Sequence, residues 1–281
     1  MSEQPRSRVG TADINGTRFV YEVAGHGHPL VLVHAGIADR RMWDDQWSVF
    51  AEHYQVIRYD MRGFGDTPMV AGPFAHRHDL FELLRFLGIG QAYLLGCSQG
   101  GTTIIDFALE HPEMAAALIP VCSTPSGQQF TGEPPRQLNE VIAAFDAGDL
   151  ERASELEVQI WVDGRKRSPY QVPAAIRDRV RAMNLIALRS DAANLGGISQ
   201  PLEPPAVGRL GELQAPTLVI VGALDEPGVI EAGETMARTI PEVRKIVIAG
   251  TAHMPNMERP DEFNRVVLEF LREVEESNTH L

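Results

Sequence analysis

A serine at position 98 stands in a glycine-rich run, Gly96-Cys97-Ser98-Gln99-Gly100-Gly101, between an apolar stretch and a segment with helical character. A strand that turns sharply into a helix at such a serine forms the G-x-S-x-G turn, whose strained apex exposes the hydroxyl. Glycines fit on either side because the chain doubles back closely on itself. The helix that follows directs its free N–H groups and positive dipole end to the same point. The run therefore predicts a nucleophilic serine, with an ordinary glycine-rich turn as the alternative.

Two further residues complete a set that can activate a serine. Asp225 follows a strongly apolar segment, and His253 lies in a glycine-bearing loop after another. A serine hydroxyl is a weak nucleophile at neutral pH, so a histidine must take its proton and a carboxylate must orient that histidine. We therefore expect Ser98, Asp225 and His253 to form a catalytic triad. Glu226 is the alternative to Asp225, and an ordinary solvated loop histidine is the alternative interpretation of His253.

The negatively charged oxygen of an acyl-transfer intermediate needs two hydrogen-bond donors. The backbone N–H of Gln99, directly after the serine, is the first candidate. The second is expected from the loop His34-Ala35-Gly36-Ile37, which follows an apolar run. The N–H of Gly36 is favoured because glycine lets the backbone approach a substrate closely, and the N–H of Ile37 is the alternative. His34 is expected to brace this loop through hydrogen bonds.

Apolar and helical segments alternate along the first 122 residues and again after position 206. Runs typical of strands are found at 17–23, 29–33, 55–59, 92–95, 117–122, 216–221 and 243–248. Helical spacing predicts helices near 38–50, 78–88, 102–110 and 231–240, followed by a last amphipathic helix around 263–271. This alternation predicts an α/β architecture, in which a parallel sheet is wrapped by helices. Sites in such sheets form at the carboxyl ends of the strands, where Ser98, Asp225 and His253 are all expected.

The alternation stops between residues 123 and 205, where helical spacing continues without a convincing strand. We therefore expect a core formed by 1–122 and 206–281, with a helical cap formed by 123–205. The alternative is that these helices simply cover the sheet. The cap would supply an apolar pocket, and the substrate-binding candidates are Ile37, Trp161 and Met183, of which the last two could equally be ordinary core residues.

The composition argues against several other classes of protein. The chain has 281 residues, a formal net charge of −13 and one compact basic run at 165–167, so a nucleic-acid surface is not expected. No apolar run is long enough to span a membrane, and the first residues lack a signal-peptide pattern, which predicts a cytoplasmic protein. Cys97 and Cys122 are expected to be buried thiols. The histidines lack metal-site spacing, so neither a metal nor a cofactor is expected.

These residues resemble the α/β-hydrolase fold family, in its serine-nucleophile branch of small esterases and lactonases. The resemblance rests on the Ser98 turn, on the order Ser98, Asp225, His253, and on the loops at 34–43, 60–65 and 253–260, and it covers nearly the whole chain. It implies a mostly parallel eight-stranded sheet with a helical lid after the sixth strand. The detailed pattern is similar to 3-oxoadipate enol-lactonase-like hydrolases. This chain has His34-Ala35 where the family usually has His-Gly, which puts the second oxyanion donor in doubt.

The leading hypothesis is a hydrolase that cleaves a small carboxylic ester or lactone through an acyl-enzyme. Hydrolysis of a carbon–carbon bond, acyl transfer and perhydrolysis use the same triad and stay open. A ligand-binding protein on a hydrolase scaffold is the alternative of another class. The expected partner is a small-molecule substrate, and the sequence leaves monomer and homodimer open.

Overall fold

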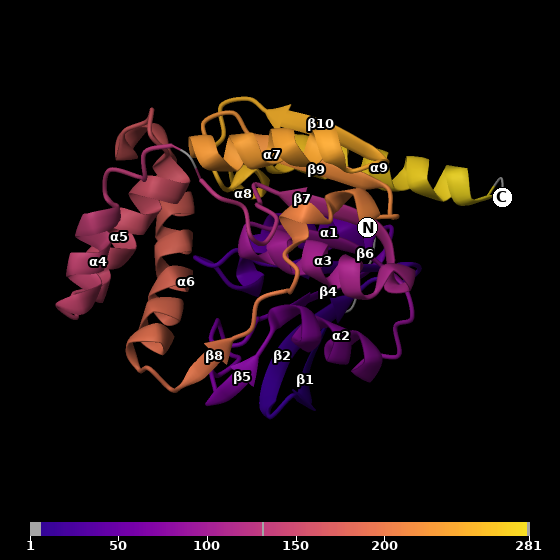
Figure 1. Cartoon of the computed structure of the whole chain (residues 1–281), viewed down its shortest axis with the longest axis horizontal. Coiled ribbons are helices and arrows are strands. Elements are labelled where there is room, and N and C mark those ends of the chain that lie inside the picture. Colours follow the sequence, from indigo (N-terminus) through magenta and orange to yellow (C-terminus); the bar gives the residue numbers. More distant parts are fainter. Residues whose placement is uncertain (1–6, 131, 280–281) are drawn as a thin grey trace, which may run out of the picture.

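An eight-stranded sheet forms the centre of the protein in a computed structural model that describes residues 7–130 and 132–279 (Figure 1). The strand order is β1-β2-β4-β3-β6-β7-β9-β10, and β2 pairs antiparallel with both β1 and β4, whereas the other neighbours run parallel. The strands of this sheet are β1 (Arg8–Ile14), β2 (Thr17–Ala24), β3 (Pro29–Val33), β4 (Gln55–Tyr59), β6 (Ala92–Cys97), β7 (Ala115–Val121), β9 (Thr217–Gly222) and β10 (Val243–Ile248). The predicted mostly parallel eight-stranded sheet is confirmed.

Helices connect most of these strands. The α-helices are α1 (Asp44–Ala51), α2 (His76–Phe86), α3 (Gln99–Glu110), α4 (Leu138–Asp146), α5 (Leu150–Val158), α6 (Ala174–Ala192), α7 (Pro227–Thr239), α8 (Pro255–Glu258) and α9 (Pro260–Thr279). Shorter helical turns are η1 (Arg40–Trp43), η2 (Pro112–Met114), η3 (Gln159–Asp163), η4 (Pro169–Gln171), η5 (Ala206–Gly208) and η6 (Leu210–Glu212). Among the helices of the described residues, none combines the length and the apolarity that crossing a membrane requires.

The two faces of the sheet are covered by different helices. Side chains alternate between the faces of a strand, and in β3 Leu32 joins one core cluster whereas Val33 joins the other. The cluster that holds Leu32 receives side chains from α1, α8 and α9, and the cluster that holds Val33 receives them from α2, α3 and α7. Because both faces are buried, the parallel strands are continuous apolar runs, and this is why the sequence revealed them.

Two short strands were not predicted. β5 (Gly72–Phe74) and β8 (Gly197–Ser199) form a separate parallel pair, and β8 falls within 123–205, where the sequence pattern indicates no strand. Each strand has three residues, all at least partly exposed, so neither carries a hydrophobic period. Their pairing joins segments more than 120 positions apart, and that tertiary contact, rather than local propensity, makes them strands. The sequence reading also missed β1, which is mostly solvent-exposed.

Helices α4, α5 and α6 stand together to one side of the sheet (Figure 1). Val141 on α4, Leu156 on α5 and Ile160 on the adjoining η3 form a small apolar cluster of their own. An ion pair of 2.9 Å between Arg179 Nη1 on α6 and Asp45 Oδ2 on α1 ties the group to the sheet domain. The segment therefore has a small apolar cluster of its own, and it also packs into the main hydrophobic core through Val158, Val162, Val172, Val180 and Met183.

The turn from β6 into α3 packs directly against the end of β3. A Cβ atom added to Gly100 would lie 2.3 Å from the carbonyl oxygen of Val33 and 2.6 Å from that of His34. These contacts are with backbone atoms, which cannot move aside as a flexible side chain would. Gly100 thus allows the first turn of α3 to lie against the loop that follows β3.

We expect Gly100→Ala to lower the free energy of unfolding by about 1–3 kcal/mol, because the new methyl group overlaps fixed backbone. Gly90→Ala is the matched control, since a Cβ there meets nothing within 4 Å, and its effect should stay within about 0.5 kcal/mol. Urea unfolding of both variants measures the difference. Equal stability of the two variants would contradict the packing described.

His34 braces the loop that follows β3 and is fully buried. Its Nε2 lies 2.9 Å from the backbone N–H of Met61, and its Nδ1 lies 2.8 Å from the carbonyl oxygen of Ala35. An N–H can only donate and a carbonyl can only accept, so Nδ1 carries the proton and Nε2 accepts. Burial lowers the pKa of His34, which favours this neutral form. The predicted bracing role is confirmed.

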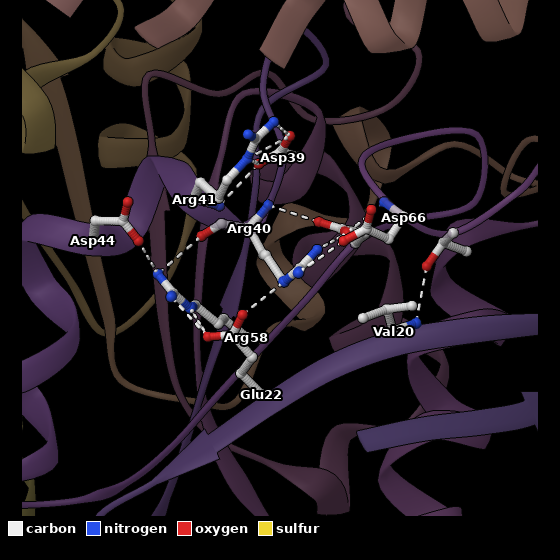
Figure 2. Close-up of polar contacts among 10 residues, drawn as sticks. Val20, Glu22, Asp39, Arg40, Arg41, Asp44, Arg58 and Asp66 are labelled. Carbon is white, nitrogen blue, oxygen red and sulfur yellow. Dashed lines mark hydrogen bonds and ion pairs between the residues drawn. The ribbon is translucent and has the colours of Figure 1, made fainter. Parts of the chain in front are cut away.

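A network of ion pairs holds the same loop against the loop that follows β4 (Figure 2). Asp60 accepts hydrogen bonds from the backbone N–H groups of Arg40, at 2.9 Å, and Asp66, at 2.8 Å, and it pairs with the Arg40 guanidinium. Arg40 Nε also donates to Glu22 at 2.9 Å, and Glu22 pairs with Arg58 at 2.7 Å. Most of these groups are largely buried, so they are screened less than surface pairs. The network fixes the position of residues 34–40.

We expect His34→Ala to lower the free energy of unfolding by about 1–3 kcal/mol, because the buried N–H of Met61 loses its acceptor. The exposed His26 offers a matched control, and His26→Ala should be nearly neutral. Chemical denaturation of the two variants tests this. A loss in His26→Ala as large as that in His34→Ala would show that His34 does not brace the loop.

Candidate active site

Ser98 occupies a strained apex between β6 and α3. Its φ of 51° and ψ of −115° lie outside the regions that residues other than glycine favour. The strain is held in place by hydrogen bonds on both sides of the residue. The N–H of Ser98 donates to the carbonyl of Val121 at 2.9 Å, and its carbonyl accepts from Thr102 N–H at 3.0 Å and Ser123 Oγ at 2.9 Å. Strain that the surroundings enforce in this way is typical of functional positions.

His253 and Asp225 form a buried pair at the carboxyl edge of the sheet. Nδ1 of His253 lies 2.9 Å from Oδ2 and 3.0 Å from Oδ1 of Asp225, and the two residues are 3% and 5% exposed. An ionised carboxylate only accepts hydrogen bonds, so Nδ1 carries the proton of the neutral ring. Nε2 is then the nitrogen with a free lone pair. The pair can therefore hold an imidazole that is ready to accept a proton.

Asp225, and not Glu226, reaches the histidine. Glu226 Oε2 pairs with Arg165 Nε at 2.6 Å, so that carboxylate is engaged elsewhere. The backbone N–H of Glu226 donates to Asp225 Oδ1 at 2.7 Å and so helps to hold the Asp225 side chain. The choice between the two acids that the sequence left open is thus decided by geometry in favour of Asp225.

The loop that carries His253 is held from several directions. The N–H of His253 donates to the carbonyl of Trp161 at 3.1 Å, and the Trp161 ring lies 4.6 Å from the imidazole, centroid to centroid. The N–H of Ala252 donates to Glu258 Oε1 at 2.8 Å, and Glu258 Oε2 pairs with Arg167 at 2.5 Å. These contacts restrict the imidazole to one orientation. Neither Glu258 nor Arg167 was singled out from the sequence.

Ser98, Gln99, Trp161 and His253 line one cavity of about 430 Å³. Ser98 and His253 therefore open into the same space, while Asp225 lies behind the histidine. Trp161, a candidate substrate-binding residue, forms part of the wall. Ile37 and Met183, the other two candidates, belong to the main hydrophobic core and are not among the described residues that line this cavity.

The two expected oxyanion donors lie next to each other. A Cβ atom on Gly36 would lie 2.6 Å from Gln99 Oε1, which shows how closely the loop after β3 approaches the start of α3. Within the described parts of the chain, the backbone N–H groups of Gly36 and Gln99 have no hydrogen-bond acceptor. The N–H of Ile37 has none either, so the geometry leaves both loop donors available. A polarised oxygen near Ser98 would find two or more free amides.

Both cysteines are buried free thiols, as predicted. Cys122 Sγ lies with the side-chain ligand atoms of Asp225 and His253 within 4.8 Å of one another, an arrangement that the sequence did not suggest. Burial raises the pKa of the Cys122 thiol well above its usual value. A protonated thiol is a poor metal ligand, because the thiolate is the coordinating form. We therefore interpret Cys122 as a structural thiol beneath the Asp225–His253 pair.

The cavity extends beyond the predicted residues along one face of α3. Thr102, Thr103 and Asp106 line it, together with His76 and Arg77 from α2. The signal for these residues is present in the sequence as a polar stripe. Ser98, which precedes α3, and Thr102 and Asp106 within it recur at intervals of four, which places them on one side of the helix.

Comparison of the sequence with known proteins identifies the family of this chain. A sequence profile described as alpha/beta hydrolase fold matches residues 28–260. The 2-hydroxy-6-oxononadienedioate/2-hydroxy-6-oxononatrienedioate hydrolase of Burkholderia vietnamiensis is 28% identical over 91% of this chain and 91% of its own length. The pimeloyl-[acyl-carrier protein] methyl ester esterase of Aeromonas hydrophila subsp. hydrophila is 26% identical over 88% of this chain and 96% of its own length.

A solved structure agrees at the level of fold. The enol-lactonase of Burkholderia xenovorans LB400 superimposes with a TM-score of 0.75, at 23% identity, over 94% of this chain and 100% of its own. At that identity the likeness concerns the fold alone. Because the profile match spans most of the sequence and the sheet has the topology that the motifs implied, the chain belongs to the alpha/beta hydrolase fold family.

Proposed function

We propose that this protein is a serine hydrolase that cleaves a carboxylic ester or lactone of a small molecule through an acyl-enzyme. The observation that carries the proposal is the Asp225–His253 pair, in which Nδ1 is bound by the carboxylate and Nε2 keeps a free lone pair. His253 shares its cavity with Ser98, whose backbone strain is enforced by its neighbours. A base, an orienting carboxylate and a hydroxyl in this relation are the parts that acyl transfer requires.

In this mechanism Ser98 Oγ attacks the carbonyl carbon while His253 Nε2 takes the hydroxyl proton. The oxygen of the tetrahedral intermediate accepts hydrogen bonds from the N–H of Gln99 and from that of Gly36, with Ile37 as the alternative to Gly36. The imidazolium, stabilised by Asp225, then protonates the leaving alcohol as the carbon–oxygen bond breaks. Water attacks the acyl-enzyme by the same steps in reverse order and releases the acid and the free serine.

Residues 123–205 are proposed to act as a cap over this cavity. Support comes from their separate apolar cluster on α4 and α5 and from η3, which brings Trp161 to the cavity wall and to the His253 backbone. A segment that both lines the cavity and contacts the base is suited to position a substrate. The sequence predicted an apolar pocket, but many residues in the described wall of the cavity are polar.

Hydrolysis of a carbon–carbon bond is the second candidate, because one of the similar proteins is named as a 2-hydroxy-6-oxononadienedioate/2-hydroxy-6-oxononatrienedioate hydrolase. The same triad could serve that reaction. Turnover of a 2-hydroxy-6-oxodienoate without turnover of any ester would favour it. Saturable ligand binding with no turnover would favour a non-catalytic binding protein instead.

We expect Ser98→Ala to lower kcat for p-nitrophenyl esters by about 10⁴-fold or more, because the acyl-enzyme can no longer form. Ser48→Ala is the matched control, since Ser48 is exposed on α1 and should leave the rate unchanged. Esters of increasing acyl length serve as substrates. Wild-type turnover by folded Ser98→Ala would refute the covalent mechanism.

We expect Asp225→Asn to lower kcat by about 10⁴-fold with little change in KM, because the amide favours the wrong tautomer of His253. Glu226→Gln changes the neighbouring acid, which pairs with Arg165, and should lower kcat far less. Steady-state kinetics of the two variants on one ester makes the comparison. A larger loss in Glu226→Gln would reassign the orienting carboxylate.

A further inference from the structure

The cavity has a second end, away from Ser98, whose chemistry restricts what it can bind. Ser98, Thr102 and Asp106 line it at intervals of four residues along α3. Eight residues of α-helix span about 12 Å. A substrate that is attacked at Ser98 can therefore present its far end to Asp106.

Three hydroxyl groups of this wall already donate their protons within the protein. Thr102 donates to the carbonyl of Thr124 at 2.7 Å, and Thr103 donates to that of Gln99 at 2.8 Å. Ser126 donates to Asp106 Oδ1 at 2.7 Å. A hydroxyl has one proton but two lone pairs, so these groups can still accept hydrogen bonds from a ligand.

The guanidinium of Arg77, which belongs to the described part of the wall, is also engaged. Arg77 Nε lies 2.9 Å from Glu110 Oε2, close enough for an ion pair although its N–H is not aimed along that contact. Its Nη1 donates to the carbonyl of Gln200 at 2.8 Å and its Nη2 to that of Pro201 at 3.4 Å. Arg77 thus holds the cavity rim and is already neutralised. It is a poor receptor for a substrate carboxylate.

Asp106 supplies the acceptor at this end. The residue is 7% exposed, and among the described residues its Oδ2 has no hydrogen-bond partner, whereas Oδ1 is bound to Ser126. Burial lowers the pKa of His76, which lines the same cavity, to about 4, so that ring carries no charge near neutral pH, and within the described chain its Nδ1 is also without a partner. The charged groups that act on Asp106 are Arg77 and Glu110, which pair with each other, and Arg209, which pairs with Glu212.

We propose that the far end of the cavity binds a hydrogen-bond donor on the substrate, such as a terminal hydroxyl group, and that Asp106 selects for it and against a terminal carboxylate. This inference rests on the proposed function, because the position of the donor is defined relative to the carbonyl that Ser98 attacks. The substrates expected are acyl chains with a terminal hydroxyl group, whereas the sequence predicted an apolar pocket.

The test compares three p-nitrophenyl esters that differ only at the far end of the acyl chain: 6-hydroxyhexanoate, heptanoate and the adipate monoester. At pH 8 we expect kcat/KM for the hydroxy ester to exceed that for heptanoate by about tenfold, because a hydrogen bond to a buried carboxylate forms. The adipate monoester should be the poorest of the three, because its carboxylate faces that of Asp106. A hydroxy-to-methyl ratio of one or less would overturn the inference.

Asp106→Asn removes the negative charge but retains a side-chain oxygen that can accept the hydrogen bond from Ser126. The hydroxy-to-heptanoate ratio should fall towards one, and the penalty on the adipate monoester should shrink. Asp146→Asn, at an exposed position at the end of α4, is the matched control and should keep the wild-type ratio. Urea unfolding confirms that both variants are folded. A ratio unchanged in folded Asp106→Asn would show that Asp106 does not select the substrate.

The wild type provides an independent test through pH. Burial raises the pKa of Asp106 to about 6, so the carboxylate is ionised at pH 8 and largely protonated at pH 5. The preference for the hydroxy ester should therefore decline as the pH falls through 6. Taking the ratio of two esters cancels any effect of pH on the steps that both esters share. A ratio that stays constant from pH 8 to pH 5 would contradict the role of the ionised carboxylate.

Failure of the proposed function gives a different result from failure of this inference. If the wild type hydrolyses none of the esters, calorimetric binding of methyl 6-hydroxyhexanoate and methyl heptanoate replaces the kinetic comparison. Tighter binding of the hydroxy ester, lost in Asp106→Asn, would support the far-end site without the hydrolase mechanism. Equal affinities would overturn it.

Discussion

The hydrogen bond between Asp225 and His253 is the interaction on which the proposed chemistry depends. It joins the ends of two parallel strands, β9 and β10, which lie side by side in the sheet although a helix separates them in the chain. With Nδ1 bound to a carboxylate, the imidazole has one tautomer, and its second nitrogen can act as a base. Trp161, Glu258 and Cys97 form hydrogen bonds with the backbone of the same loop and so help to keep His253 beside Asp225.

The strained turn at Ser98 depends on the same sheet edge. Because β6 lies between β3 and β7, the turn at its end packs against the loop after β3 on one side and against β7 on the other. His34 and the Asp60–Arg40 ion pair keep the β3 loop in place, so that free amides of that loop and of α3 lie close together. Stability and chemistry are therefore coupled here: the groups that hold the backbone also define where an oxyanion could be bound.

Much of this arrangement could be predicted from the sequence, for identifiable reasons. Buried parallel strands are apolar on both faces, so β3, β6 and β9 are continuous runs, and the residues at their ends mark the edge of the sheet. The strands β5 and β8 could not be predicted, because three exposed residues carry no period and only their mutual pairing defines them. The choice between Asp225 and Glu226 also needed coordinates, since two adjacent acids have the same sequence context.

The cavity wall shows where sequence patterns are weakest. Trp161 on η3 lines the cavity, but Met183 on α6 lies in the core, because the side of a helix that faces a cavity depends on how the helix packs. The hydroxyl groups of Thr102 and Thr103 on α3 can accept hydrogen bonds because each already donates its proton to a backbone carbonyl. Residue types alone do not reveal these partners. Arg77 is the clearest case, since its charge suggests an anion site although its guanidinium is already engaged by Glu110 and by the carbonyl of Gln200.

The central claim, a nucleophilic serine at position 98, is tested most directly by covalent labelling. The protein is treated with a fluorophosphonate, which reacts with activated serine hydroxyls, and the intact mass and the modified peptide are determined by mass spectrometry. The account predicts one adduct per chain, located on the peptide that contains Ser98, and no adduct in Ser98→Ala. An adduct at another residue, or none in a preparation that hydrolyses esters, would contradict it.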